Sequence, residues 1–265
     1  MKLQVLVATM NQKDFSIIEK MNIRCDVVIA NQFDRDEILI RNTEGCLQKM
    51  ITTNTRGVGK NRNIALLAAS EEIVLFADDD VEYNDDLVNR VTDAFKNNPQ
   101  ADVIVFGMDM MKDGLVYEKR RCRKQKLHIW NSMRYGTYRI AARRNALINN
   151  NISFHQCFGG GCLFGSGEDS LFLKECFDKK LKVYSHDYVL GRCSKDKSTW
   201  FTGCDEKYFY DKGVLVRHLF PFTAYLMALY FGICFKRETN ISVFNRLALI
   251  YAGIHNGKKM IPYNN

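Results

Sequence analysis

The chain has 265 residues, 46% of them hydrophobic and 26% charged, and these ordinary globular proportions exclude a disordered or low-complexity protein. A chain of this length forms one large domain or slightly more. Its 38 basic and 30 acidic side chains give a formal charge of +8, which favours a polyanionic partner: nucleic acid, an anionic membrane surface or a phosphorylated ligand.

Apolar runs rich in β-branched residues alternate with helical patterns in the first half of the chain. We predict strands at residues 2–8, 25–30, 72–77 and 102–106, and helices at 14–21, 62–70 and 85–97. Short apolar strands separated by helices are typical of a parallel sheet covered on both faces. The sequence therefore predicts an α/β sandwich with its ligand site at the carboxyl ends of the strands.

A glycine-rich turn precedes the second of these helices. A P-loop needs glycine at position 54 and serine or threonine at 61, but these positions hold Asn54 and Asn61. The dinucleotide pattern needs glycine at 62, where Arg62 stands. Neither nucleotide motif is present, although a turn of this kind before a helix is expected to offer backbone N–H groups to an anion.

Three consecutive carboxylates, Asp78, Asp79 and Asp80, directly follow the apolar strand at 72–77. Residues i and i+2 of an extended chain share a face, so Asp78 and Asp80 point together while Asp79 points away. Like charges this close destabilise the fold unless a cation or donors neutralise them. A divalent metal completed by substrate phosphates would do so. The alternative is an Asp-rich turn that caps the next helix.

A second acidic pair, Glu168 and Asp169, stands in a glycine-rich stretch at the start of a helix predicted over 170–179. The positive end of a helix stabilises an anion at this position. An ionised aspartate here can accept the proton of a sugar hydroxyl in a transition state. An ordinary helix cap is the alternative, and the acidic triple makes the catalytic interpretation the better one.

Together these segments resemble the family-2 GT-A glycosyltransferases, and most closely the branch found in capsule and lipopolysaccharide gene products. The resemblance covers roughly residues 1–190. It rests on the strand ending at Thr9, the segment 56–65, the D-x-D motif at 78–80 and the Gly-Glu-Asp motif at 167–169. It implies a GT-A fold: a mainly parallel central sheet flanked by helices, followed by a helical C-terminal tail.

The resemblance also implies which residues bind the nucleotide-sugar donor. Thr9 would lie beside the nucleotide, Arg62 would meet the diphosphate, and Asp78 would lie near the sugar or ribose, with Asp79 in the same donor site. The family usually recognises the base with an aspartate after the second strand. Here Asn31 stands in that region, and its amide would pair with uracil.

On the catalytic side, the resemblance implies that Asp169 is the base that deprotonates the acceptor hydroxyl and that Glu168 positions the acceptor. Asp80, with Asp78 beside it, would ligate Mn²⁺ or Mg²⁺. His218 is a weaker candidate for a third ligand, with a structural role as the alternative.

Four further features have more than one interpretation. His186 is a metal-ligand candidate for which a structural role is favoured, and Trp200 either stacks on a sugar or packs internally. The basic run at 119–126 lacks nucleic-acid motifs; a solvated face or an anionic lipid contact explains it better. The uncharged segment 219–235, followed by Lys236 and Arg237, fits an interfacial helix, with a packed core helix as the alternative.

We therefore predict a metal-dependent inverting glycosyltransferase that moves a sugar from a nucleotide-diphosphate donor, with UDP-sugar favoured, to a lipid-linked glycan. The alternative is an inactive GT-A-fold scaffold. Residues 1–215 would form the catalytic domain, with 1–110 the nucleotide half and 111–215 the acceptor half, and 216–265 a helical tail. Unpaired cysteines and the short apolar N-terminal run favour the cytoplasmic side of a membrane, and nucleic acid is not an expected partner.

Overall fold

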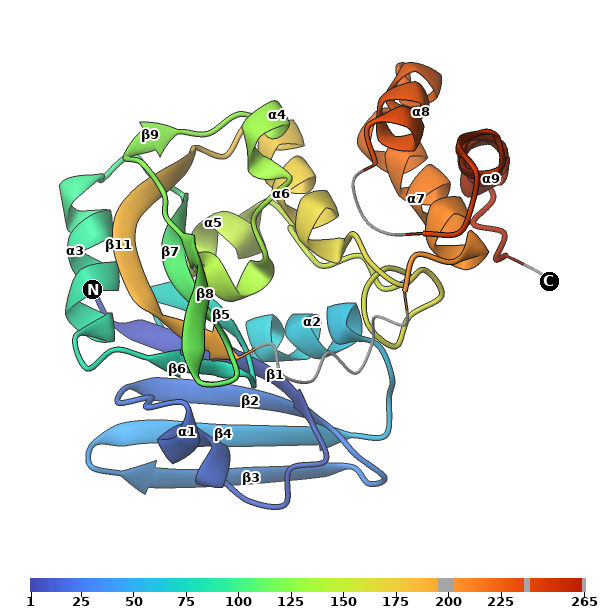
Figure 1. Cartoon of the computed structure of the whole chain (residues 1–265). Coiled ribbons are helices and arrows are strands. Elements are labelled where there is room, and N and C mark those ends of the chain that lie inside the picture. The colour runs from blue at the N-terminus through green and yellow to red at the C-terminus, as the bar shows by residue number, and fades with distance from the viewer. Residues whose placement is uncertain (195–202, 236–238, 264–265) are drawn as a thin grey trace.

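The computed structural model describes residues 1–194, 203–235 and 239–263. Within these residues one sheet contains eleven strands in the order β3-β4-β2-β1-β5-β10-β7-β11-β6, with β8 paired to β7 and β9 to β11 (Figure 1). The strands are β1 (Leu3–Met10), β2 (Asp26–Gln32), β3 (Glu37–Thr43), β4 (Cys46–Thr53), β5 (Ile73–Asp78), β6 (Val81–Tyr83), β7 (Val103–Lys112), β8 (Leu115–Arg120), β9 (Gln125–Lys126), β10 (Ile140–Arg143) and β11 (Val183–Ser194).

The helices complete an α/β architecture, as predicted. They are α1 (Ser16–Lys20), α2 (Val58–Ala68), α3 (Leu87–Asn97), α4 (Ile129–Ser132), α5 (Arg144–Asn149), α6 (Glu168–Asp178), α7 (Glu206–Leu219), α8 (Ala224–Ile233) and α9 (Val243–Gly257), with a 3₁₀ turn η1 (Thr137–Arg139). The four predicted strands are confirmed as β1, β2, β5 and β7, and the four predicted helices as α1, α2, α3 and α6.

The predicted α/β fold, with a central sheet flanked by helices, is confirmed, and the sheet is mixed. Strands β1, β2, β4 and β5 are parallel, as are β7 and β11. Strand β10 lies antiparallel between β5 and β7, and hairpins add β3 and β8. The hairpin turns at Glu44-Gly45 and Asp113-Gly114 have positive φ at both residues, which is the conformation of a type I′ turn and matches the twist of the strands.

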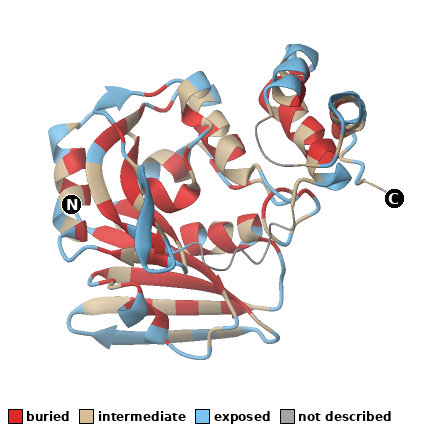
Figure 2. Ribbon diagram, viewed as in Figure 1, coloured by how far each residue is buried: buried red, intermediate tan, exposed pale blue. Residues whose placement is uncertain are grey.

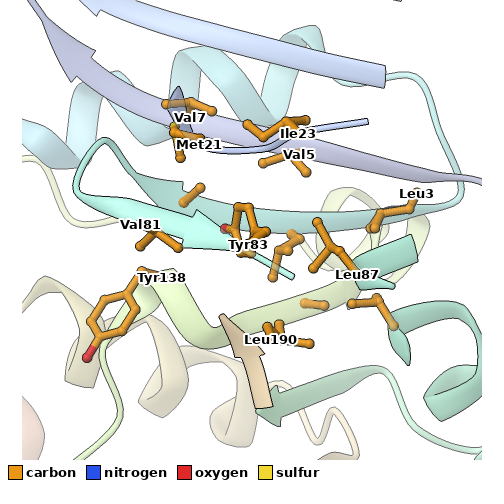
Figure 3. Packing of buried hydrophobic residues seen from close by; sticks show 14 of the residues in the cluster. Leu3, Val5, Val7, Met21, Ile23, Val81, Tyr83, Leu87, Tyr138 and Leu190 are labelled. Carbon is orange, nitrogen blue, oxygen red and sulfur yellow. The ribbon is translucent and has the colours of Figure 1, made fainter. Parts of the chain in front are cut away.

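Alternate residues of the central strands feed two separate cores. Along β5, Ile73 and Leu75 face the core shared with α1 and α3, whereas Val74 and Phe76 face the core shared with α2, α5 and α6. This alternation follows from the period of two of a strand. Figure 3 shows the first core, and Figure 2 shows that both faces of the central strands are buried. The carboxyl ends of β1 and β5 are thereby held rigidly.

The three C-terminal helices form a third core and lie together beside the sheet (Figure 1). Helices α7 and α9 cross closely at two glycines: a Cβ on Gly213 would lie 2.1 Å from the carbonyl oxygen of Ile250. This core also includes Phe158 and Phe164 of the glycine-rich stretch before α6. The position at which we divided catalytic domain from tail, 215/216, falls inside α7, so the helical unit begins at Glu206.

Helix α8 buries its small residues and exposes most of its large apolar ones. Its buried residues are the small ones, Ala224, Ala228 and Gly232, spaced four apart, and Leu247 of α9 fills the space beside Gly232. Its large apolar side chains face outward and are largely exposed: Tyr225, Leu226, Tyr230 and Ile233, with Phe222 in the preceding turn. The segment 219–235 is not one continuous helix, because α7 ends at Leu219 and α8 begins at Ala224. No helix in the described ranges has the length and hydropathy to cross a bilayer.

Candidate active site

Four charged side chains from three separate elements meet at the carboxyl end of β5. Arg62 of α2 donates from Nη2 to Oδ1 of Asp78 at 2.7 Å. Its Nη1 donates to Glu168 Oε1 at 3.1 Å and to Asp169 Oδ1 at 3.3 Å, both at the start of α6. The Asp-Asp-Asp segment and the Gly-Glu-Asp segment, some ninety positions apart in sequence, are thus joined through one guanidinium, and Phe154 packs against it.

The environment of Arg62 is unusual because the side chain is only 4% exposed. Burial alone would lower the pKa of Arg62, but the charges of Asp78, Asp169 and Glu168 outweigh it and raise that pKa above its ordinary value. The guanidinium therefore remains charged. A buried cation bound by several carboxylates fixes their relative positions, because removing it would leave them unpaired.

Asp169 is poised to exchange a proton near neutrality. Burial, with the negative charge of Glu168 as a second cause, raises the pKa of Asp169 to about 7, although Arg62 and a hydrogen bond from Thr137 oppose the shift. A general base works best when its pKa lies near the working pH. The Thr137 hydroxyl donates to Asp169 Oδ1. Thr137 carries no recognisable sequence signal, and we did not predict it.

The other two carboxylates of the acidic triple differ from Asp78. Asp79 accepts a hydrogen bond from the Thr9 hydroxyl at 2.6 Å, which ties the ends of β1 and β5 together. Asp80 is exposed, and no basic side chain in the described residues forms an ion pair with it. Partial desolvation of its carboxyl, with the charge of Asp78 as the next cause, raises the pKa of Asp80 to about 6.

The fit of the site to a metal ion is partial. Among the described residues no three His, Cys, Asp or Glu side chains are placed to hold a metal ion together. Asp78 is engaged by Arg62, so Asp80 is the carboxylate left for a cation. Desolvation, and after it the charge of Asp78, disfavour the ionised form of Asp80, and a divalent ion bound by Asp80 and by phosphate oxygens would stabilise that form.

His218 contacts Val214, Phe158 and His155 among the described residues, and its role as a third metal ligand stays a prediction. Its Nδ1 lies 3.0 Å from the carbonyl oxygen of Val214, and its ring packs against Phe158 and His155. His186 is buried against Phe106 and Tyr188, in agreement with the structural interpretation. Trp200 and the pair Lys236-Arg237 lie outside the described residues.

Two donor-site predictions need correction. Asn31 is fully buried: its amide donates to Gln12 and Thr52, and its oxygen accepts from the Gln12 N–H, so it holds the turn after β1 and does not face a base. Arg62 is committed to three carboxylates and is nearly inaccessible, so it does not present itself to a diphosphate.

The turn before α2 also differs from its prediction. Two of its N–H groups are occupied within the protein: Gly57 donates to Gln32 Oε1 and Val58 to the carbonyl oxygen of Gly160. These two groups are therefore not free for an anion. The amide of Asn61 donates to the carbonyl oxygens of Thr9 and Ala30, so this turn serves to lock α2 against the ends of β1 and β2.

Comparisons with known proteins agree with this architecture. Residues 16–162, more than half of the chain, match the family described as Glycosyl transferase family 2. The crystal structure of S. aureus TarS 1-349 in complex with UDP-GlcNAc is similar, with a TM-score of 0.60 and 17% identity over 96% of this chain and 72% of that one. TarS 1-349 in complex with UDP gives a TM-score of 0.58 at 17% identity, over 98% and 72% of the two chains.

A further crystal structure, that of S. aureus TarS without the 1-349 limits, is also similar. The match covers 96% of this chain but only 43% of that one, with a TM-score of 0.55 and 18% identity. No curated protein sequence matches the chain. At identities this low the structural likeness concerns the fold alone, and that fold is GT-A.

Proposed function

Because the chain belongs to glycosyl transferase family 2 and is a glycosyltransferase of GT-A fold, we propose that it transfers a sugar with inversion from a nucleotide diphosphate to a glycan acceptor. The observation that carries this proposal is the junction of Asp78, Arg62, Glu168 and Asp169. In this junction the Arg62 guanidinium pairs with Asp78, which we place on the donor side, and with Asp169, whose pKa lies near 7.

In the proposed reaction Asp169 accepts the proton of the acceptor hydroxyl as that oxygen attacks the anomeric carbon. Glu168, whose carboxylate also accepts from the Gly167 N–H, positions the acceptor. Thr9 and Asp79 lie beside the nucleotide. A Mn²⁺ or Mg²⁺ ion bound at Asp80 would offset the negative charge on the departing diphosphate.

We favour a UDP-sugar as donor, with UDP-GlcNAc as the first probe because the TarS fragment binds it. Since Asn31 is buried, its amide gives no basis for choosing the base. The proposed acceptor is a lipid-linked glycan of the kind assembled for capsule or lipopolysaccharide. We assign residues 1–110 to donor binding, 111–205 to acceptor binding and the helical unit from Glu206 to membrane docking, which moves the predicted boundary at 215/216 to the start of α7.

We further propose that the chain docks peripherally on the cytoplasmic face of a membrane. The support is that α8 buries small residues and exposes large apolar ones. A helix that served only as core would bury its large side chains, because each buried Leu or Phe contributes roughly 1.5–3 kcal/mol. Here Leu226 and Tyr230 are 68% and 60% exposed, and Phe222 is 99% exposed. Helices α8 and α9 contain no acidic residue, which suits an anionic surface.

Release of nucleoside diphosphate from UDP-GlcNAc, UDP-glucose, UDP-galactose and GDP-mannose, with Mn²⁺ or with EDTA, tests the enzymatic proposal. We expect release from one of the UDP-sugars, with Mn²⁺ required. Tight binding of a UDP-sugar without any release would favour the inactive scaffold, and neither binding nor release would reject the donor class.

Sedimentation with vesicles of phosphatidylcholine and phosphatidylglycerol tests the docking proposal separately. We expect binding at low salt that Leu226→Asp abolishes. The matched control is Leu67→Asp, which changes an equally exposed leucine on α2 and should leave vesicle binding intact. Protein that stays in the supernatant at low salt, or equal losses in both variants, would reject docking through α8.

A further inference from the structure

The two oxygens of the Asp169 carboxylate have different surroundings. Oδ1 accepts a hydrogen bond from the Thr137 hydroxyl and a second one from Arg62 Nη1 at 3.3 Å. No hydrogen bond reaches Oδ2 from any residue that the structure describes, and the side chain is 32% exposed. One oxygen is therefore anchored within the protein, and the other is available to a bound substrate.

The anchor on the Thr137 side is rigid. Thr137 is fully buried at the start of η1, and the next two residues are tied to the sheet. Arg139 donates from Nε to the carbonyl oxygen of Phe106 at 2.7 Å, and the Tyr138 hydroxyl accepts from Arg120 at 2.8 Å. Because these contacts fix η1 on β7 and β8, the Thr137 hydroxyl is held in place before any ligand arrives.

We propose that Thr137 is a positioning residue, which holds Asp169 by Oδ1 so that Oδ2 is the oxygen that receives the acceptor proton. This inference rests on the proposed function. The acceptor O–H bond breaks and its proton moves to Oδ2, while the acceptor oxygen forms a bond to the anomeric carbon. The bond from that carbon to the diphosphate oxygen breaks, and its electron pair leaves with the nucleoside diphosphate.

The Thr137 hydrogen bond can persist through this step. Once Oδ2 is protonated, Oδ1 becomes the carbonyl oxygen of a neutral carboxyl group and still accepts a hydrogen bond from the Thr137 hydroxyl. The charged groups around Asp169 are Arg62 from α2, Glu168 from α6 and Asp78 from β5. Thr137 is uncharged, so replacing it removes one hydrogen bond and leaves the charge of the site unchanged.

The test uses Thr137→Val, which keeps the branched shape, and Thr137→Ser, which keeps the hydroxyl. Thr92→Val is the matched control, because Thr92 is a buried threonine whose hydroxyl, among the residues that the structure describes, bonds to carbonyls of its own helix, with Val88 at 2.9 Å. The carboxyl ¹³C signal of Asp169, assigned by its loss in Asp169→Asn, is titrated in each full-length protein. Hydrolysis of UDP-GlcNAc is measured in parallel.

Thr137→Val should raise the apparent pKa of Asp169 by about one unit, because a hydrogen bond to a charged group is lost. It should lower kcat about tenfold with an unchanged KM, whereas Thr137→Ser and Thr92→Val should behave as wild type. An Asp169 titration that Thr137→Val does not move would overturn the proposal. If the valine variant does not fold, Thr137→Ala is read by the same criterion. The titration needs no turnover, so failure of the donor reaction would reject the proposed function alone.

Discussion

Replacing Arg62 by methionine should expose how strongly the site depends on one buried cation. Methionine fills a similar volume without charge, so Asp78, Glu168 and Asp169 lose their shared partner. Breaking a buried ion pair from one side costs about 3–5 kcal/mol. Because the Asp78 and Asp169 side chains are each 32% exposed, water replaces part of the lost interaction, and we expect a loss near the lower limit, about 3 kcal/mol.

For a chain of this size that loss lowers Tm by about 6 °C. The loss should also depend on pH. Without Arg62 the pKa of Asp169 rises beyond about 7, further above its value in the unfolded chain. An acid of this kind weakens the native state as the pH rises from the unfolded pKa to the native pKa. The variant should therefore lose more stability at pH 8 than at pH 5.

Thermal unfolding of wild type, Arg62→Met and Arg192→Met at both pH values provides the measurement. Arg192 makes a bidentate ion pair with Glu82, but both side chains are about half exposed, so its loss should be at most ~1 kcal/mol. Equal losses of stability in the two variants, or an Arg62→Met loss of stability that is the same at pH 5 and pH 8, would refute the assignment of Arg62 as the buried cation that holds these three carboxylates.

Three further outcomes follow from the same structure. Asp80→Ala should weaken the Mn²⁺-dependent part of UDP binding in calorimetric titration, and unchanged affinity would remove Asp80 from the metal site. Because the native pKa of Asp169 is raised to about 7, Tm of the ligand-free protein should fall between pH 5 and pH 8, and Asp169→Asn should reduce that fall; an unaltered slope would contradict the raised pKa. Gly213→Val should disrupt the α7–α9 crossing, because its Cβ would meet the carbonyl oxygen of Ile250, and a Tm equal to wild type would contradict that packing.

The order of the central elements was readable from the sequence because fully apolar strands and amphipathic helices carry strong periodic signals. The antiparallel strands were missed for local reasons. The Asp113-Gly114 pair is a recognised hairpin signal that we did not use, whereas β10 is only four residues long and depends on β5 and β7 for its pairing. Tertiary contacts of this kind leave no period in the sequence.

The site was predictable in its acidic residues but not in how they are paired. The carboxylates of Asp78 and Asp169 stand out in sequence because they follow a buried strand and begin a helix. That Arg62 would join them, or that Asn31 would turn inward, depends on side-chain directions fixed by packing across the sheet. Thr137 had no signal at all, since a lone threonine in a loop gains its role only from the position of η1.

Hydrolysis of the nucleotide sugar by wild type and by Asp169→Asn tests the central claim most directly, because water can replace the acceptor hydroxyl and still needs the base. Donor affinity is measured on the same samples. We predict unchanged donor binding and a rate lower by about 10²–10⁴-fold in the variant, which is the usual contribution of a general base. Equal rates with equal donor binding would contradict the assignment of Asp169 as the group that accepts the proton.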